Sequence, residues 1–325
     1  MNLQIYMSEH ISELPEKPSE LFQIAPIPKD SEGISKALDF LYIYEPFCLY
    51  LIGNLEKYGP VSTDHPHSGN FFMVSTKASI VGVFYACNSG LVLAYISFPS
   101  LSNQLFDSIL SKLLEDNTKV LGILAEENTA QYLVSSFSRR FGERLKILIE
   151  TQNELMKIDG LKEKLNEFCV NVECNDEVRF LRPGDYSSWF ELMGKFQEEI
   201  RISSDPEELQ ERIFESEVEL KHIWGYLKGS ELICIVRLNS CTRTGGCFGG
   251  LYNKPEFRGR GIAKILIRQA LSDCAKIHDH AHNVLFTGAA NFSALNLYYS
   301  IGYLKIGQIK ICFFDYNNKD HLIFK

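Results

Sequence analysis

Residues 255–263 read Pro-Glu-Phe-Arg-Gly-Arg-Gly-Ile-Ala, and this stretch decides the fold. It predicts a glycine-rich, doubly basic loop between an apolar strand and a helix. Glycines let neighbouring backbone N–H groups converge because no Cβ lies in the way. The helix that follows points its first unpaired N–H groups and its positive dipole end at the same place. The loop therefore suits an anion such as a pyrophosphate; the alternative is a basic turn whose glycines only supply positive φ.

The same residues exclude two common phosphate-binding motifs. No Lys-Ser or Lys-Thr pair follows the glycines, so this is not a Walker loop, and the GxGxxG spacing of a dinucleotide-binding loop is absent. The chain has a net charge of −8, yet basic side chains gather here, at Arg258, Arg260, Lys264 and Arg268. A local basic site in an acidic protein suits a phosphorylated small molecule and disfavours nucleic acid as the main partner.

A second segment, residues 291–303, reads Asn-Phe-Ser-Ala-Leu-Asn-Leu-Tyr-Tyr-Ser-Ile-Gly-Tyr. Asn291 suits an N-cap and Gly302 suits the position after the last turn, which predicts a helix of about three turns. Tyr298 lies seven residues after Asn291, about two turns on, so their side chains share a face and Tyr299 is rotated off it. Tyr298 is therefore the candidate for chemistry; the alternative is a capped amphipathic helix with core tyrosines.

Together, the two segments resemble the GNAT superfamily of N-acetyltransferases. Arg258 to Ala263 have the Arg-x-x-Gly-x-Ala form of its coenzyme A loop, and residues 291–303 are similar to its Asn-x-x-Ala-x-x-Leu-Tyr-x-x-x-Gly-aromatic pattern. In that pattern the asparagine contacts the pantetheine arm and the tyrosine lies near the thioester sulfur. The resemblance implies acetyl-CoA as co-substrate, bound by Arg258, Gly259, Arg260, Gly261, Ile262, Ala263, Asn291 and Ala294.

Length and composition bound the overall organisation. With 325 residues, 45% hydrophobic and 23% charged, the chain is long enough for two globular domains. Its nine cysteines include no CxxC pair, and their odd number argues against a closed disulfide framework, so we expect reduced thiols. The N-terminus lacks a signal-peptide pattern, and Glu45-Pro46 interrupts the most apolar segment, residues 40–55. We expect a cytoplasmic protein without a membrane span.

The C-terminal part, residues 177–325, follows the GNAT order of elements after a polar linker at 161–176. We expect a strand, two helices, three strands, a helix, a strand, a helix and two strands. The strands are predicted at 178–182, on both sides of 228–230, and at 247–252, 284–287, 303–306 and 309–314. The helices are predicted through Trp189, after Pro206, from Ile262 and after Asn291.

Residues 1–160 repeat this order more weakly, with strands at 71–76, 79–86 and 91–97, then a helix, a strand at 120–124 and a helix. Residues 155–158 are expected to close this domain as a strand. The loop at 98–102, Phe-Pro-Ser-Leu-Ser, has neither glycine nor arginine, so it cannot form a pyrophosphate cradle. The chain thus resembles tandem GNAT proteins with a degenerate first domain and an active second one. The predicted fold is α/β (α+β), with two GNAT-like domains that each have a mixed, mostly antiparallel sheet flanked by helices.

The implied chemistry is direct transfer of an acetyl group to a primary amine. Tyr298 can keep its proton at neutral pH and donate it to the leaving thiolate. The resemblance assigns polarisation of the carbonyl to the backbone around Leu251, Tyr252 and Asn253, beside a bulge that Gly249-Gly250 permits. Family members often carry a glutamate on that strand, but residues 247–252 hold no carboxylate. Glu198 or Glu199 can serve as the base, directly or through water; the alternative is that both are solvated surface charges.

The sequence also bears on metal binding, on the acceptor and on an alternative function. Residues 278–282, His-Asp-His-Ala-His, have no cysteine or second cluster at zinc spacing, so we expect no metal. The acceptor is an amine on a small metabolite, amino acid or peptide, and the sequence does not distinguish among them, nor does it define the acyl-chain preference or the oligomeric state. The alternative function is a non-catalytic acyl-CoA-binding sensor or interaction protein.

Overall fold

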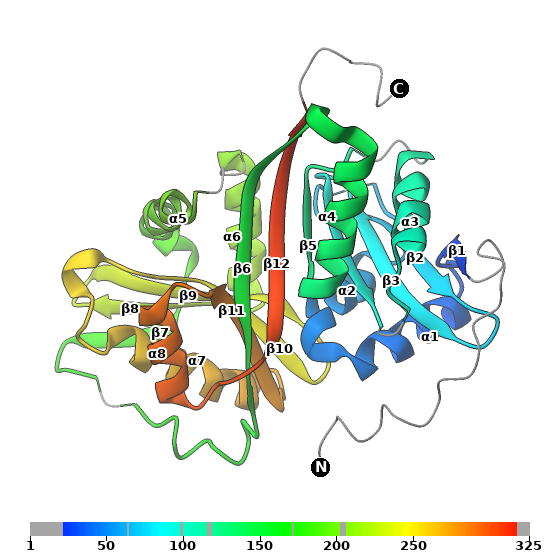
Figure 1. Ribbon diagram of the computed structural model, residues 1–325. Coiled ribbons are helices and arrows are strands. Elements are labelled where there is room, and N and C mark those ends of the chain that lie inside the picture. Colours follow the sequence, from blue (N-terminus) through cyan, green and yellow to red (C-terminus); the bar gives the residue numbers. More distant parts are fainter. Residues whose placement is uncertain are drawn as a thin grey trace.

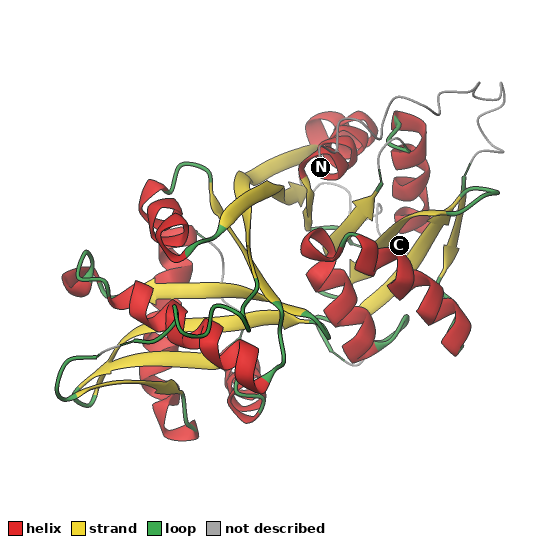
Figure 2. Cartoon of the chain, turned by 90° about the horizontal axis from the view of Figure 1, so that it is seen from below, coloured by secondary structure: helices red, strands yellow, loops and turns green. Residues whose placement is uncertain are grey.

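The computed structural model describes residues 22–316 except 64, 98–99, 116–118, 171 and 202–205. Within these residues the strands form a single twelve-stranded sheet in the order β1-β2-β3-β4-β5-β12-β6-β11-β10-β9-β8-β7. The sheet runs through the whole molecule, and helices lie on both of its faces (Figures 1 and 2). The fold is mixed α/β with a mostly antiparallel sheet, as predicted.

The N-terminal half buries both faces of its strands. Phe71, Val83 and Tyr85 pack with α1 and α2, whereas their neighbours Phe72 and Phe84 pack with α3 and α4, as the two-residue period of a strand requires. Its elements are β1 (Gln23–Pro26), α1 (Ser31–Ile43), α2 (Glu45–Tyr58), β2 (Gly69–Ser75), β3 (Ile80–Cys87), β4 (Leu91–Ile96), α3 (Asn103–Glu115), β5 (Gly122–Glu126), α4 (Glu127–Phe141) and β6 (Leu145–Asp159).

The C-terminal half has the same layering. Ile235 and Tyr252 pack with α5 and α6, and Val236 and Phe248 pack with α7 on the opposite face. Its elements are β7 (Asp176–Phe180), α5 (Tyr186–Ile200), α6 (Glu207–Glu219), β8 (Ile223–Lys228), β9 (Glu231–Cys241), β10 (Gly245–Asn253), α7 (Ile262–Ile277), β11 (His282–Gly288), α8 (Phe292–Ile301) and β12 (Leu304–Tyr316).

One predicted boundary in this half is wrong. The two strands expected at 303–306 and 309–314 are one continuous strand, β12, with a register shift between Lys305 and Gly307. A Cβ at Gly307 would lie 2.6 Å from a ring carbon of Phe47. The glycine therefore allows Phe47 to pack against the strand rather than allowing the chain to turn.

The last strand of each half pairs with the other half of the chain. β6 pairs with β11 along its carboxyl-terminal part, from Asn153↔Gly288 to Asp159↔His282. β12 crosses in the other direction, pairing with β6 on one side and with β5 on the other. The expectation that residues 155–158 close the N-terminal domain is wrong, because β6 pairs with β11 and β12 and with none of the described strands β1 to β5. The boundaries at 160 and 177 stay predictions, and the sheet continues across them.

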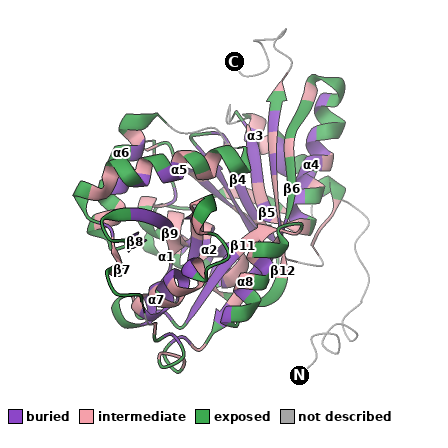
Figure 3. Cartoon of the chain, turned by 90° about the vertical axis from the view of Figure 1, so that its left-hand side faces the viewer, coloured by how far each residue is buried: buried purple, intermediate pink, exposed green. Residues whose placement is uncertain are grey.

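Helix α2 adds a second connection between the halves, because it packs on β9 and β10 as well as on β4. Buried residues follow the strands and the inner faces of the helices, and exposed residues lie on the outer helix faces (Figure 3). None of the helices in the described ranges has both the length and the apolar content of a membrane span.

Candidate active site

The site begins where two parallel strands separate. β10 and β11 pair only from Gly245↔His282 to Phe248↔Leu285, although both strands continue beyond these positions. β10 stays paired with β9 through a bulge between Gly249 and Tyr252, in which Gly250 has φ +61°. The bulge expected at Gly249-Gly250 is therefore present. It turns β10 away from β11 and leaves residues 251–253 beside a gap in the sheet.

The glycine-rich loop connects β10 to α7 next to this gap. Gly259 has φ +75° and Gly261 has φ +80°, both in the left-handed region that favours glycine. A Cβ at either glycine would meet no atom within 4 Å, so backbone conformation alone accounts for glycine here. Gly261 is the N-cap of α7 and provides no side-chain cap. The first N–H groups of α7 are thus left for a ligand.

The two arginines of the loop have different roles in the structure. Arg258 donates through Nε to the Asn253 carbonyl at 3.0 Å and through Nη2 to Glu199 Oε1 at 2.6 Å, which ties the loop to β10 and α5. Arg260 lies over the Phe257 ring, 5.4 Å from its centroid, and is exposed. The Asn253 side chain donates to the Phe257 carbonyl at 3.2 Å, and its own Oδ1 is buried without a hydrogen-bond partner.

Helix α8 has the predicted caps. The Asn291 side chain accepts a hydrogen bond from the Ala294 N–H at 3.2 Å, and Gly302, with φ +110°, ends the helix. Tyr298 is buried, whereas Tyr299 is 49% exposed, so the two tyrosines differ as their spacing predicts. The Tyr298 ring packs against Tyr303 with centroids 5.7 Å apart. Burial raises the pKa of the Tyr298 phenol, so it keeps its proton at neutral pH.

Glu198 lies on the last turn of α5 and is exposed. Within the described residues, no hydrogen bond or ion pair of its side chain connects it with Tyr298, the loop or β10. The neighbouring Glu199 is engaged by Arg258. The structure therefore brings the residues of the glycine-rich loop next to the gap, with Glu199 in contact with that loop and Glu198 one residue before it on α5.

The N-terminal half contributes contacts to this site that the sequence does not reveal. The Tyr50 hydroxyl, on α2, accepts a hydrogen bond from Asn239 Nδ2 at 3.2 Å and lies 3.8 Å from Cys247 Sγ on β10. Ser240 Oγ donates to the Leu49 carbonyl at 2.9 Å. These partners are nearly 200 residues apart in the chain, so no local pattern reveals them.

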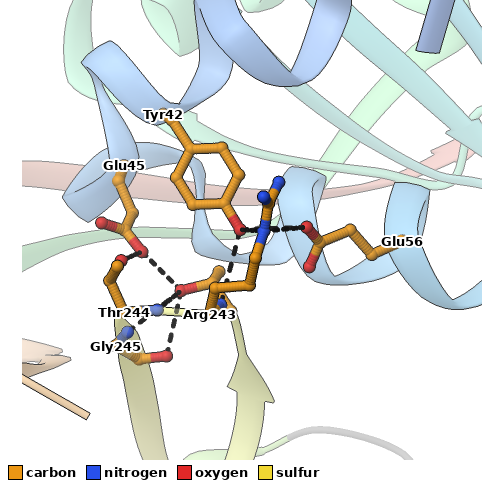
Figure 4. A network of polar contacts seen from close by, with 7 residues as sticks. Tyr42, Glu45, Glu56, Arg243, Thr244 and Gly245 are labelled. Atoms are coloured by element: carbon orange, nitrogen blue, oxygen red, sulfur yellow. Dashed lines mark hydrogen bonds and ion pairs between the residues drawn. The ribbon is translucent and has the colours of Figure 1, made fainter. Parts of the chain in front are cut away.

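A polar network fixes the hairpin between β9 and β10 to α1 and α2 (Figure 4). Thr242 and Thr244 both donate to the buried carboxylate of Glu45, Thr244 at 2.6 Å. Arg243 Nε donates to the Tyr42 hydroxyl and to Glu56 Oε1, both at 3.2 Å. The N-terminal half thus holds the strand that precedes the glycine-rich loop.

Several histidines lie near this hairpin, among them His280 and His282. In the described part of the chain, no three His, Cys, Asp or Glu side chains are arranged to hold a metal ion. The rings of His278 and His280 stack with centroids 5.5 Å apart. Burial lowers the pKa of His280 to about 4, so it is neutral at physiological pH.

The N-terminal half lacks this arrangement at the corresponding helix. Phe98 and Pro99 lie outside the described residues. α3 begins at Asn103, and Ser102 Oγ accepts from the Leu105 N–H at 3.3 Å. Unlike α7, α3 therefore has a side chain that occupies one of its first N–H groups.

Comparison with known proteins identifies the fold. Residues 186–303 match the acetyltransferase (GNAT) family. A solved protein from Drosophila superimposes with a TM-score of 0.61 at 15% identity, covering 89% of this chain and 98% of its own. A tandem GNAT protein from the clavulanic acid biosynthesis pathway gives 0.58 at 10% identity, covering 92% and 100%. A GCN5-related N-acetyltransferase from Sphaerobacter thermophilus gives 0.58 at 12% identity, covering 90% and 94%.

No curated protein has a sequence that matches this chain significantly. The family match and the fold nevertheless agree on the class of protein. Residues 186–303 form a GNAT acetyltransferase domain, and the N-terminal half has a GNAT-like fold as well.

Proposed function

We propose that the protein is a cytoplasmic, acetyl-CoA-dependent N-acyltransferase that moves an acetyl group to a primary amine by direct transfer. The observation that carries the proposal is the loop with two left-handed glycines at the uncapped start of α7, beside the gap between β10 and β11. Membership of residues 186–303 in the GNAT family supports it.

The residues present fit the co-substrate. Converging N–H groups and two guanidinium groups suit a pyrophosphate, and the proposed binding residues of this loop are Arg258, Gly259, Arg260, Gly261, Ile262 and Ala263. Beside it, the unpartnered Oδ1 of Asn253 and the backbone of Leu251 and Tyr252 border the gap. Asn291 and Ala294 are the proposed pantetheine contacts. The Asn291 Oδ1 accepts the capping hydrogen bond from the Ala294 N–H, so the Asn291 Nδ2 remains for a ligand.

Acetyl-CoA, when bound, supplies a thioester whose carbonyl carbon accepts the amine. The new N–C bond forms as the C–S bond breaks, the nitrogen loses one proton, and the sulfur gains one. We propose that the Tyr298 hydroxyl donates this proton to the sulfur, since burial raises the pKa of the phenol and keeps it protonated. We propose Glu198 as the acceptor of the amine proton through intervening water, because its carboxylate is exposed and its neighbour Glu199 binds Arg258 of the glycine-rich loop.

The test is acetyl-CoA binding and turnover by the full-length chain. Acetyl-CoA is expected to raise the melting temperature, and a panel of primary amines is expected to release free coenzyme A thiol. Stabilisation without thiol release for any amine would instead support the alternative, an acyl-CoA-binding sensor. That alternative draws on one observation, the absence of a carboxylate in residues 245–253 of β10.

A further inference from the structure

A large cleft lies between the two halves of the molecule. Its volume is about 950 Å³, and it is lined by α2 and the N-terminal strands on one side and by α6 and β9 on the other. Its polar lining residues include Tyr50, Lys57, Arg212, Arg237 and Asn239. Both halves therefore contribute side chains to one cavity, which neither half forms alone.

One residue of the cleft lining, Arg237, lies beside the bulge of β10. Arg237 on β9 pairs with Gly249, where the bulge of β10 begins, and a Cβ at Gly250 would lie 3.4 Å from Arg237 Cγ. The neighbours Val236 and Leu238 pack on the α7 face, so Arg237 points to the opposite face, where α2 and α5 lie. Arg237 therefore connects the cleft with the bulge of β10, on the face of the sheet opposite α7.

Three cationic side chains line the cleft without a carboxylate partner in the described part of the chain. Arg237, Arg212 and Lys57 make no ion pair within the described residues. Its two carboxylates are both engaged, because Glu56 accepts from Arg243 at 3.2 Å and Glu217 lies 3.3 Å from His222 Nδ1. Arg237 is only half-buried, so its guanidinium is open to an anionic ligand. The planar guanidinium matches a carboxylate through two parallel hydrogen bonds.

A chain of hydrogen bonds orients Arg237 from the N-terminal half. Arg237 donates through Nε to Asn239 Oδ1, and Asn239 Nδ2 donates to the Tyr50 hydroxyl at 3.2 Å. This leaves the terminal nitrogens of Arg237 without a partner in the described residues. Tyr50 is therefore a positioning residue that acts on Arg237 through Asn239.

We propose that this cleft binds the acceptor and that the acceptor is an amino acid or a similar amine with a free carboxylate, which Arg237 holds. The inference rests on the proposed acetyl transfer. The carboxylate stays on Arg237 while the amine enters the gap. The N–C bond forms, the C–S bond breaks, one proton leaves the nitrogen and one reaches the thiolate, giving an N-acetyl acid and free coenzyme A. The cleft volume leaves room for the acceptor side chain.

The experiment compares each amino acid with its decarboxylated amine, such as phenylalanine with phenethylamine and leucine with isoamylamine. Free thiol release from acetyl-CoA is followed with the full-length chain. We expect kcat/KM to favour the acids by at least tenfold. Arg237→Gln should raise KM for the acids by roughly 10- to 100-fold, the range of a lost charge-assisted hydrogen bond, and remove the preference. Arg237→Lys should restore part of it.

Two controls separate this role from a structural one. The increase in melting temperature caused by acetyl-CoA should be unchanged in Arg237→Gln, and Arg140→Gln, an exposed arginine of α4, should behave like wild type. Tyr50→Phe should raise KM for the acids and leave the decarboxylated amines unaffected. Equal use of acids and amines by the wild type, or an unchanged preference in Arg237→Gln, overturns the inference. Acetyl-CoA binding without thiol release for any amine overturns the proposed function itself.

Discussion

At the residue scale, Tyr298 and Tyr299 provide a matched pair, because they are adjacent in sequence and differ in burial. Tyr298→Phe removes the proposed proton donor and keeps the ring that packs on Tyr303. Positioned acid catalysis typically contributes 10²–10⁴-fold, so kcat should fall by roughly that factor while the affinity for acetyl-CoA changes little. Tyr299→Phe should have almost no effect. Steady-state kinetics under conditions where chemistry limits the rate test this, and an unchanged kcat in Tyr298→Phe would exclude Tyr298 from proton transfer.

A second prediction at this scale concerns the pH dependence of stability at His222. Burial by itself would lower the pKa of this imidazole, but the Cys241 thiol and the Glu217 carboxylate outweigh it and raise the pKa to about 9. Since the folded pKa exceeds the unfolded value of 6.5, the stabilisation is complete below pH 6.5 and is lost as the pH rises through 9. It is at most about 3 kcal/mol, because one pKa unit corresponds to about 1.4 kcal/mol.

Chemical denaturation of wild type and His222→Gln between pH 6.5 and 9 measures the contribution of His222 to the free energy of unfolding. The difference in their free energies of unfolding should shrink between pH 6.5 and 9. His278, whose ring centroid lies 5.2 Å from that of His222, is the matched control. Burial lowers its pKa, so it is already neutral in this window and His278→Gln should show no such pH dependence. A pH-independent difference for His222→Gln would contradict the assignment.

At the element scale, the start of α7 is the proposed binding site for acetyl-CoA. A ligand that binds only the folded state adds about 2.7 kcal/mol of stability at a hundredfold excess over Kd. Gly261→Asp should abolish this stabilisation, because it places a negative side chain where phosphate oxygens are expected. Gly229→Asp is the matched control, since Gly229 also has a left-handed φ, +60°, and its Cβ would meet no atom within 4 Å. Thermal denaturation with and without acetyl-CoA tests this prediction. An equal increase in melting temperature for wild type and Gly261→Asp would show that the loop does not bind the cofactor.

Most elements were predictable because their signals are local. The caps of α8, the glycine bulge in β10 and the loop before α7 each depend on residue types within one turn or one strand. The continuity of β12 was not predictable, because a glycine at position 307 suggests a break between two strands. Gly307 is instead explained by its contact with Phe47, from another part of the chain. Arg237 and Tyr50 were missed for the same reason, because only packing of α2 on β9 gives them a shared position.

At the scale of the whole molecule, each half contributes its last strand to the other half, which we call strand exchange: β6 pairs with β11, and β12 pairs with β5. This exchange makes the two halves interdependent. The tandem arrangement of two GNAT-like folds could be predicted from the order of elements, whereas the exchange could not. A strand that closes its own domain and one that pairs with the neighbouring domain have the same alternating pattern. The pairing partner is decided by the tertiary arrangement, in which β6 lies between β11 and β12.

This arrangement predicts how fragments behave. Residues 177–325 expressed alone lack β6, so β11 loses its antiparallel neighbour and β12 loses the partners on both of its sides, β5 and β6. Unpaired strand edges and the apolar surface that faced α2 should make this fragment aggregate. Co-expression with residues 1–176 should restore a soluble complex that acetyl-CoA stabilises. Size-exclusion chromatography of the two preparations measures this, and a monomeric, acetyl-CoA-binding 177–325 fragment would show that the C-terminal half closes its sheet without the exchanged strand.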